Sequence, residues 1–198
     1  MMVAGAGDVM GRGYTIFDTA IGRSAIVWSD AGIVGVHLPE AREIDTRRRV
    51  YQLYPEPREL RPPMNTEIAI EGIVALLRGQ ASDLAEVTLD MLGIHVFNQR
   101  VYEITRKVPR GETRSYDEIA TRLGAPSAAR SAEQAIAKNP FMIIVPCHRV
   151  LDSYADKISP NGGTISRRHL LSIDGIHPAH SKTLFDVLLP VAPPRPHH

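Results

Sequence analysis

Hydrophobic positions in the first forty residues follow the short, closely spaced runs that are typical of β-strands. The runs 14–19, 24–28 and 32–38 are rich in β-forming residues, and turn signals at Gly22 and Asp30 separate them. A proline follows the third run and ends it. The pattern predicts a small antiparallel meander at the start of the chain.

The next fifty residues have less regular patterns. Residues 42–63 are charged and rich in proline, which favours a helical turn followed by a loop. Asn65 is a candidate cap for a helix that ends near Gly79, because the apolar residues between them fall roughly on one face. Residues 87–92 are expected to form another strand or an extended connector.

From Phe97 onwards the period of the apolar positions becomes helical. Apolar residues spaced four, three and four apart run from Phe97 to Val108, which predicts an amphipathic helix. Ser115 and Glu118 have the spacing of a capping box, which predicts a second helix over residues 116–123.

A third helix is expected from a Ser127 cap to about Lys138. Two short helices joined by a turn that contains glycine are typical of a helix-turn-helix, but any compact helical hairpin has the same pattern. In the third helix Ala132 and Ala135 are expected to face inward, while Arg130 projects as a cation from the other side.

Composition and charge narrow the classes of protein to which the chain can belong. Its 198 residues, 43% of them hydrophobic, suffice for one sizeable core or two modest ones. The sequence has neither a run of about 18 apolar residues nor a basic leader, so we expect a cytoplasmic protein without a membrane span. Residues 1–96 hold 9 Lys/Arg against 13 Asp/Glu, whereas residues 97–175 hold 12 against 8, a net charge of +4. That surplus favours an anionic partner such as nucleic acid, although a solvated surface can carry the same charge.

A single cysteine is the main candidate for chemistry. Residues 141–150 read FMIIVPCHRV, which predicts a buried apolar strand and then Cys147 beside His148 and Arg149. Neighbouring positive charge lowers the pKa of a thiol and favours the reactive thiolate. One cysteine allows no internal disulfide and no Cys-x-x-Cys zinc spacing, so no metal site is expected. The residues alone leave Cys147 either a reactive thiol or a small hydrophobic residue of the core.

The segment Pro146-Cys147-His148-Arg149-Val150 resembles the active-site signature of the methylated-DNA–protein cysteine methyltransferases, also called O(6)-alkylguanine-DNA alkyltransferases. Further features match that family in order: residues 97–109, Gly111, Ser115-Tyr116, Ile119-Ala120, Gly124-x-Pro126, Ala129-Arg130, Asn139-Pro140, Gly162-Gly163, Leu170-Leu171 and Asp174-Gly175. The resemblance implies an α+β fold. A small N-terminal domain with an antiparallel sheet would span residues 1–93, a C-terminal helical domain with a winged-helix-like helix-turn-helix residues 94–178, and a flexible tail residues 179–198.

The resemblance implies DNA repair by direct reversal, in which Cys147 accepts an alkyl group from O(6) of guanine and the protein is consumed in a single turnover. His148 would relay the thiol proton through a water toward the carboxylate of Asp174. Asn139 would orient groups around the site, and Tyr116 could donate a proton to the departing base. No cofactor is implied. The implied partner is double-stranded DNA that contains alkylated guanine, with no membrane, no obligate protein partner and a monomeric state.

The resemblance also assigns residues to DNA binding and to the substrate pocket. A guanine O(6) atom in a stacked duplex is out of reach of a buried thiol, so the nucleotide must be extruded. Arg130 matches the arginine that fills the vacated place, and Tyr116 matches the tyrosine that crowds the target phosphate. Further residues implied in DNA binding are Ser115, Ala129 and Gln134, and those implied in the substrate pocket are Pro146, Ser159, Asn161 and Gly162.

The chain departs from the family pattern at several positions. Asp174 stands where most relatives have glutamate, and its side chain is one methylene shorter, so a water is expected to bridge it to His148. Residues 152–161 lack the usual Tyr-x-Gly-Gly ending. Arg167 replaces a common lysine, and Glu133 brings a carboxylate into the predicted recognition helix.

Two other functions compete with repair. A damage sensor binds alkylated DNA without accepting the alkyl group, but such proteins have another residue at the position of Cys147. A cysteine hydrolase would need Cys147 and a histidine as a catalytic pair. On the predicted strand, Cys147 and His148 would point to opposite faces and make a poor pair unless the chain bends there. Repair is therefore the function that the sequence favours.

Overall fold

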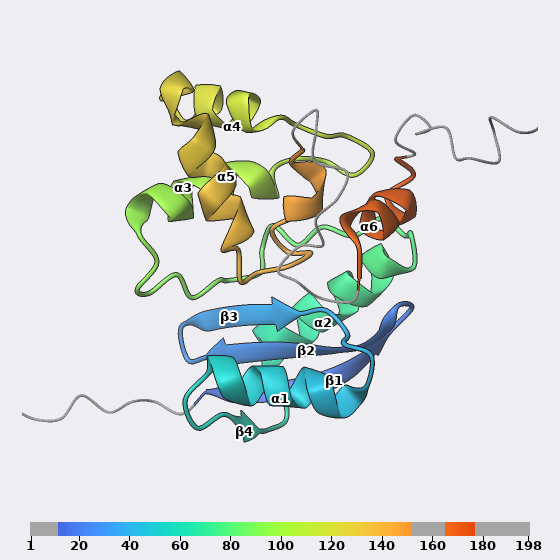
Figure 1. The fold of residues 1–198 in the computed structure, drawn as a ribbon. Helices are drawn as coiled ribbons and strands as arrows, with labels where there is room; N and C mark the ends of the chain where they lie inside the picture. The colour runs from blue at the N-terminus through green and yellow to red at the C-terminus, as the bar shows by residue number, and fades with distance from the viewer. Residues whose placement is uncertain (1–11, 152–164, 177–198) are drawn as a thin grey trace, which may run out of the picture.

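A computed structural model of the protein describes residues 12–151 and 165–176. In the predicted meander, β1 (Gly13–Thr19), β2 (Gly22–Ser29) and β3 (Gly32–His37) pair antiparallel, and the short β4 (Arg58–Glu59) adds in parallel to β1. The strand order is β3-β2-β1-β4. Figure 1 shows this sheet in one half of the molecule and helices α3, α4 and α5 in the other. The predicted α+β fold is confirmed, with one parallel strand added to the antiparallel sheet.

Two helices cover the two faces of the sheet, with α1 (Glu43–Leu53) in front and α2 (Met64–Leu77) behind in Figure 1. The prediction of a single helical turn in residues 42–63 was wrong, because α1 spans 11 residues. Its apolar pattern is weak because only Thr46 and Val50 are buried on it. Ion pairs on the outer surface, such as Arg47 to Glu43 at 2.9 Å, support the helix instead.

The connector after α2 runs along the edge of the sheet. Its residues 87–92 do not form a regular strand; a single parallel bridge joins Leu89 to Ile33. The expectation that Asn65 caps α2 was wrong, because the helix begins at Met64 after Pro63. The Asn65 side chain instead accepts from the backbone N–H of Thr88 at 2.9 Å and donates to its carbonyl at 3.1 Å. It therefore fastens the connector to α2.

The second half contains helices α3 (Val96–Arg106), α4 (Tyr116–Arg122), α5 (Ala129–Ala137) and α6 (Arg167–Ile173), together with the short 3₁₀ helices η1 (Pro126–Ala128) and η2 (Cys147–Arg149). The capping box at α4 is confirmed: the Ser115 hydroxyl accepts from the N–H of Glu118, and the Glu118 carboxylate accepts from the N–H of Ser115. Ser127 does not cap α5, because it lies inside η1 and makes no capping hydrogen bond. None of the helices within residues 12–151 and 165–176 has the length and hydrophobicity that a transmembrane span requires.

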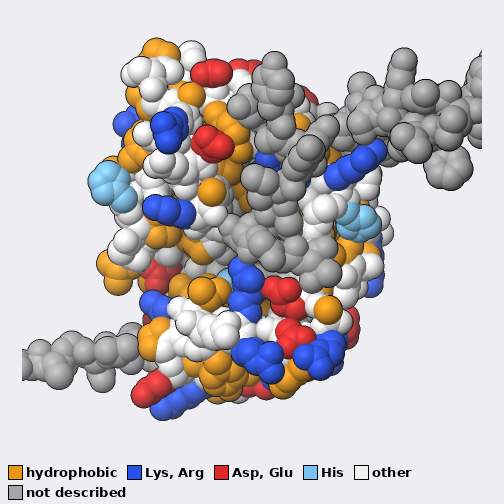
Figure 2. Space-filling model, in the orientation of Figure 1, with side chains coloured by type: hydrophobic (Ala, Val, Ile, Leu, Met, Phe, Trp, Pro, Cys, Tyr) orange, Lys and Arg blue, Asp and Glu red, His pale blue; other side chains and the backbone are white. Residues whose placement is uncertain are grey.

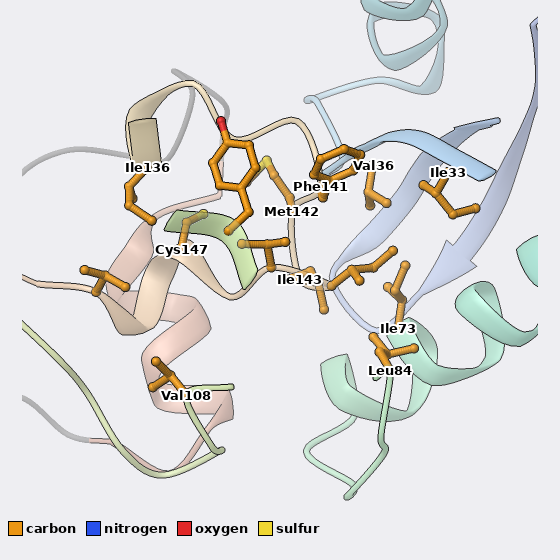
Figure 3. Close-up of a cluster of buried hydrophobic side chains, with 14 of the residues drawn as sticks. Ile33, Val36, Ile73, Leu84, Val108, Ile136, Phe141, Met142, Ile143 and Cys147 are labelled. Atoms are coloured by element: carbon orange, nitrogen blue, oxygen red, sulfur yellow. The ribbon is translucent and has the colours of Figure 1, made fainter. Parts of the chain in front are cut away.

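The segment 141–145 joins the two halves, but it is not the predicted strand. It makes a tight turn in which the N–H of Val145 donates to the carbonyl of Phe141 at 2.8 Å and Ile143 has a φ of 71°. The N–H of Val36 on β3 donates to the carbonyl of Pro140 at 2.8 Å. The apolar run is therefore buried as a turn, and its side chains continue the core from the sheet to Cys147 without a break, as Figure 3 shows.

Candidate active site

Cys147 lies at the start of η2, where its thiol is buried in the core between the two halves. The turn before it is held by Asn139, whose amide nitrogen donates to the carbonyl of Val145 at 2.9 Å and whose amide oxygen accepts from the N–H of Phe141 at 2.9 Å. Asn139 also makes a side-chain hydrogen bond with the thiol of Cys147. The buried amide of Asn139 thus holds the turn before Cys147 and also contacts the Cys147 sulfur.

Asp174 follows α6 and binds two neighbours of Cys147. Its Oδ2 accepts from Nε2 of His148 at 3.0 Å and from Nε of Arg149 at 2.6 Å, and its Oδ1 accepts from Nη2 of Arg149 at 3.1 Å. All three side chains are buried. The expected water between Asp174 and His148 was wrong, because α6 brings the shorter carboxylate within direct hydrogen-bonding distance of the imidazole.

The electrostatic prediction for Cys147 was also wrong. Burial raises the pKa of the thiol above its ordinary value, and the contacts with Asn139 and Arg167 offset this only in part. The neighbouring Arg149 does not stabilise a thiolate, because its guanidinium is paired with Asp174 and also donates to the carbonyl of Val108 at 2.9 Å. At neutral pH the sulfur is therefore held as a thiol that needs a base.

His148 has the properties of that base. Burial lowers the pKa of its imidazole, which the contact with Asp174 opposes, so the ring is neutral at neutral pH. An ionised carboxylate only accepts hydrogen bonds, so the proton of the neutral ring lies on Nε2 and Nδ1 has a free lone pair. Nδ1 is buried and has no hydrogen-bond partner among the described residues. The carboxylate of Asp174 stays ionised at neutral pH. Burial raises the pKa of Asp174, but its contacts with His148 and Arg149 outweigh that effect and lower the pKa to about 2.

The strand argument against a Cys147–His148 pair was wrong in its premise, because both residues lie on η2. In the described part of the chain, however, their side chains make no hydrogen bond with each other, and the imidazole is oriented by Asp174. Direct proton transfer as in a cysteine hydrolase therefore has no support in this geometry.

Tyr116 is the first residue of α4, and its ring is buried close to Cys147. Burial raises the pKa of its phenol, while a side-chain hydrogen bond with Arg167 at the start of α6 lowers it in part. The phenol is thus protonated at neutral pH and lies beside a cation. This arrangement provides a proton donor next to the thiol.

Helix α5 presents its small residues to the core and its polar residues outward. Ala132 and Ala135 are buried, as predicted, whereas Arg130 and Gln134 are exposed and Ala129 is half-buried. Arg130 has no ion pair within the described ranges, and Glu133 does not pair with it. On the face in Figure 2, cationic and acidic side chains are mixed rather than gathered in a patch of one sign.

The structure brings together five of the predicted site residues: Cys147, His148, Asp174, Asn139 and Tyr116. Pro146 is buried next to them. Ser159, Asn161 and Gly162 lie outside the described residues. Ser115 uses its hydroxyl in the capping box at the same end of α4 as Tyr116.

Sequence reasoning missed the role of Arg149 as the clamp on Asp174, and it missed Arg110. The Arg110 Nη2 donates to the carbonyl of Ile173 at 2.8 Å, and its Nε lies 3.7 Å from Asp174 Oδ1. These partners are separated by 25 or more residues in the chain, so no local spacing could have indicated them.

Three comparisons relate the chain to known proteins. A family model described as the DNA-binding domain of 6-O-methylguanine DNA methyltransferase matches residues 96–176. A methylated-DNA–protein-cysteine methyltransferase of Mycolicibacterium paratuberculosis is 40% identical over 119 residues, which is 60% of this chain and 70% of the relative. A protein of the same name from Methanothermobacter thermautotrophicus is 30% identical over 76% of this chain and 78% of the relative. The crystal structure of Mycobacterium tuberculosis OGT in complex with DNA superimposes with a TM-score of 0.63 at 31% identity, covering 82% of this chain and 93% of that one.

Proposed function

The chain belongs to the methylated-DNA–protein-cysteine methyltransferase family, and we propose that Cys147 is the residue on which it accepts the alkyl group. Its function is the repair of alkylated DNA by direct reversal, in a single turnover for each protein molecule. The observation that supports Cys147 as the acceptor is its burial beside a neutral imidazole whose Nδ1 is unpartnered among the described residues.

The reaction is a displacement at the alkyl carbon. The sulfur of Cys147 forms a bond to that carbon while the bond from carbon to O(6) of guanine breaks. The thiol proton passes to Nδ1 of His148 through one water, and Asp174 stabilises the imidazolium that forms. Because a thioether has no good leaving group, no later step restores the thiol.

The departing guanine needs a proton to leave as a neutral base. Tyr116 is placed to supply it, because its phenol is protonated and lies near Cys147. Arg167 then stabilises the phenolate until a proton returns from solvent. Asn139 keeps the sulfur aligned through its contacts with the turn before Cys147.

The protein binds DNA, and we propose that its substrate is a duplex containing O(6)-alkylguanine. Residues 94–178 would form the domain for DNA binding and alkyl transfer, in which α4 and α5 act as the helix-turn-helix. Arg130 would fill the place of the extruded nucleotide, with further DNA contacts from Ser115, Tyr116, Ala129 and Gln134. Pro146, Ser159, Asn161 and Gly162 would line the pocket for the base. We further propose that the protein acts as a monomer and that it is located in the cytoplasm.

Intact-protein mass spectrometry tests the acceptor directly. The protein is incubated with a duplex that contains one O(6)-methylguanine, and we expect a gain of one methyl group on the peptide with Cys147. Cys147→Ala should bind the duplex with similar affinity and gain no mass, because the thiol is needed for bond formation and not for phosphate contacts. Methyl transfer by Cys147→Ala would show that another residue is the acceptor, and binding by the unaltered protein without any gain would favour the damage sensor.

A further inference from the structure

A groove of about 750 Å³ lies between the two halves of the protein, on a side formed by α2, the connector after it and the end of α3. Its volume is in the range of sites that hold a small molecule or several apolar side chains. Figure 3 shows three of its apolar residues, Leu84, Val108 and Ile143, which come from three separate segments. No lining residue belongs to α4 or α5, so the groove is separate from the DNA contacts proposed for those helices, and it meets the active site at Pro146 and Arg149.

The described chain ends beside this groove. Arg110 lines the groove and donates to the carbonyl of Ile173, the last residue of α6, at 2.8 Å. Ile176, three residues later, is the last residue that the structure describes. The sequence then continues for 22 residues and contains the segment 184–189, LFDVLL, in which five of six residues are apolar. The eight steps from Ile176 to the start of that segment can span up to roughly 26 Å, and α6 already ends against Arg110 of the groove.

We propose that the apolar segment 184–189 of the C-terminal tail docks in this groove of its own chain. The groove walls offer the apolar surface that such a run needs to leave water. Three cations that are close in the sequence, Arg106, Lys107 and Arg110, also line the groove. Asp186 is the single charged residue of the segment, and its carboxylate matches the positive charge of these cations. The proposal does not rest on the alkyl-transfer function.

Hydrogen exchange on three forms of the protein tests this docking. They are the full chain, a chain that ends after Pro178, and a matched control that ends after Val191 and so keeps the segment. Loss of the segment should speed amide exchange in residues 81–85 and 106–110 about tenfold and lower the Tm by about 5 °C. The control should match the full chain in both measurements.

Two further measurements guard against an indirect effect of truncation. A peptide with the sequence of residues 182–191 should restore protection to the chain that ends after Pro178, and the same peptide with Asp186→Lys should restore less. In the full chain, Leu188→Lys should expose the same segments as truncation does. Equal exchange in the full and shortened chains would overturn the proposal. So would protection that rises with protein concentration, because the groove would then hold the tail of a second copy.

Discussion

At the scale of single residues, the positions of a few protons around Cys147 decide whether the site can react. Burial keeps the sulfur as a thiol, and the cation next to it in the sequence is engaged by Asp174. His148 is neutral, with its Nδ1 unpartnered in the described part of the chain. The site therefore depends on a base whose orientation is set by one carboxylate.

Asp174→Asn should slow alkyl transfer at neutral pH at least about tenfold, because the amide cannot stabilise an imidazolium as a carboxylate does. The difference should shrink as the pH rises, since the thiol then ionises without a base. The measurement is the transfer rate from about pH 6 to pH 10, a range that brackets an ordinary thiol pKa. The exposed Asp117→Asn on α4 is the matched control. Superimposable profiles for Asp174→Asn and the unaltered protein would show that Asp174 only packs the end of α6.

Asp174→Glu distinguishes two views of this site. If a water bridged Asp174 to His148, the longer glutamate would preserve or raise the rate. Asp174 already contacts His148 directly at 3.0 Å and is clamped by Arg149, so a longer side chain would have to displace these buried partners; we expect a lower rate and a lower Tm. A rate above that of the unaltered protein would contradict this expectation.

Arg130→Ala should slow transfer from duplex DNA by one to two orders of magnitude and transfer from single strands by much less. Unstacking a base costs a few kcal/mol, and a side chain that fills the gap offsets part of that cost only where a stack exists. Arg130 is exposed and has no ion pair in the described ranges, so its removal should not harm the fold. Arg48→Ala on α1 is the control. Equal slowing on both substrates would exclude the proposed role.

At the scale of elements, α4 and α5 present the proposed DNA contacts, and their ends are held differently. Helix α4 begins with a complete capping box, whereas α5 follows η1 and has no side-chain cap. The side of α5 that carries Ala132 and Ala135 is buried, so packing rather than capping holds that helix in place. Substitution of Ser115 and of Ser127, which both resemble helix caps in the sequence, should therefore lower the stability of the protein by unequal amounts.

Ser115→Ala should destabilise the protein by about 1 kcal/mol, because the N–H of Glu118 loses its acceptor. For a chain of this length that corresponds to a fall in Tm of about 2 to 4 °C. Ser127→Ala, which removes no capping bond, should change stability by less than about 0.5 kcal/mol. Thermal unfolding without DNA measures both. Equal losses would mean that the capping bond of Ser115 adds no stability beyond that of an uncapped serine.

At the scale of the whole molecule, one continuous core joins the sheet to the site, while a smaller cluster under α1 stabilises the sheet from its other face. Next to that cluster, Nε2 of His37 lies 2.9 Å from the Tyr54 hydroxyl, and burial lowers the pKa of His37 to about 4. The unfolded chain binds a proton at His37 near pH 6.5. The contribution of His37 to the free energy of unfolding is therefore fully present above that pH and is lost as the pH drops toward 4.

His37→Gln should flatten the dependence of stability on pH between 6.5 and 4. The full loss from His37 over that range is about 3 kcal/mol, so the variant should lose markedly less on acidification than the unaltered protein. The exposed His169→Gln is the control and should keep the original slope. Denaturant unfolding at several pH values measures the effect. Parallel curves for His37→Gln and the unaltered protein would contradict it.

Binding of the whole protein to duplex DNA should weaken with salt and depend little on sequence, because phosphate contacts dominate. The modest net charge of +4 in residues 97–175 predicts a shallow slope. A titration from 50 to about 300 mM salt measures it. An affinity that does not change with salt would exclude phosphates as the main contact.

The sequence by itself determined the features that depend on neighbours along the chain. The β-runs around Gly22 predicted the meander, and the Ser115–Glu118 spacing predicted the cap of α4, because turns and caps are local interactions. The segment around Cys147 identified the candidate site through its resemblance to a known family. The apolar run before Cys147 was misjudged as a strand, since burial of a short run does not specify whether its backbone turns.

Only the tertiary structure decided which charges meet. Arg149 was expected to activate Cys147. In the structure, α6 places Asp174, 25 residues further along the chain, against Arg149, and the carboxylate neutralises the charge of the guanidinium. Burial then sets the direction of the thiol pKa, because desolvation outweighs the polar contacts that remain. These effects depend on distances between segments that are far apart in the chain, and residue order alone does not contain them.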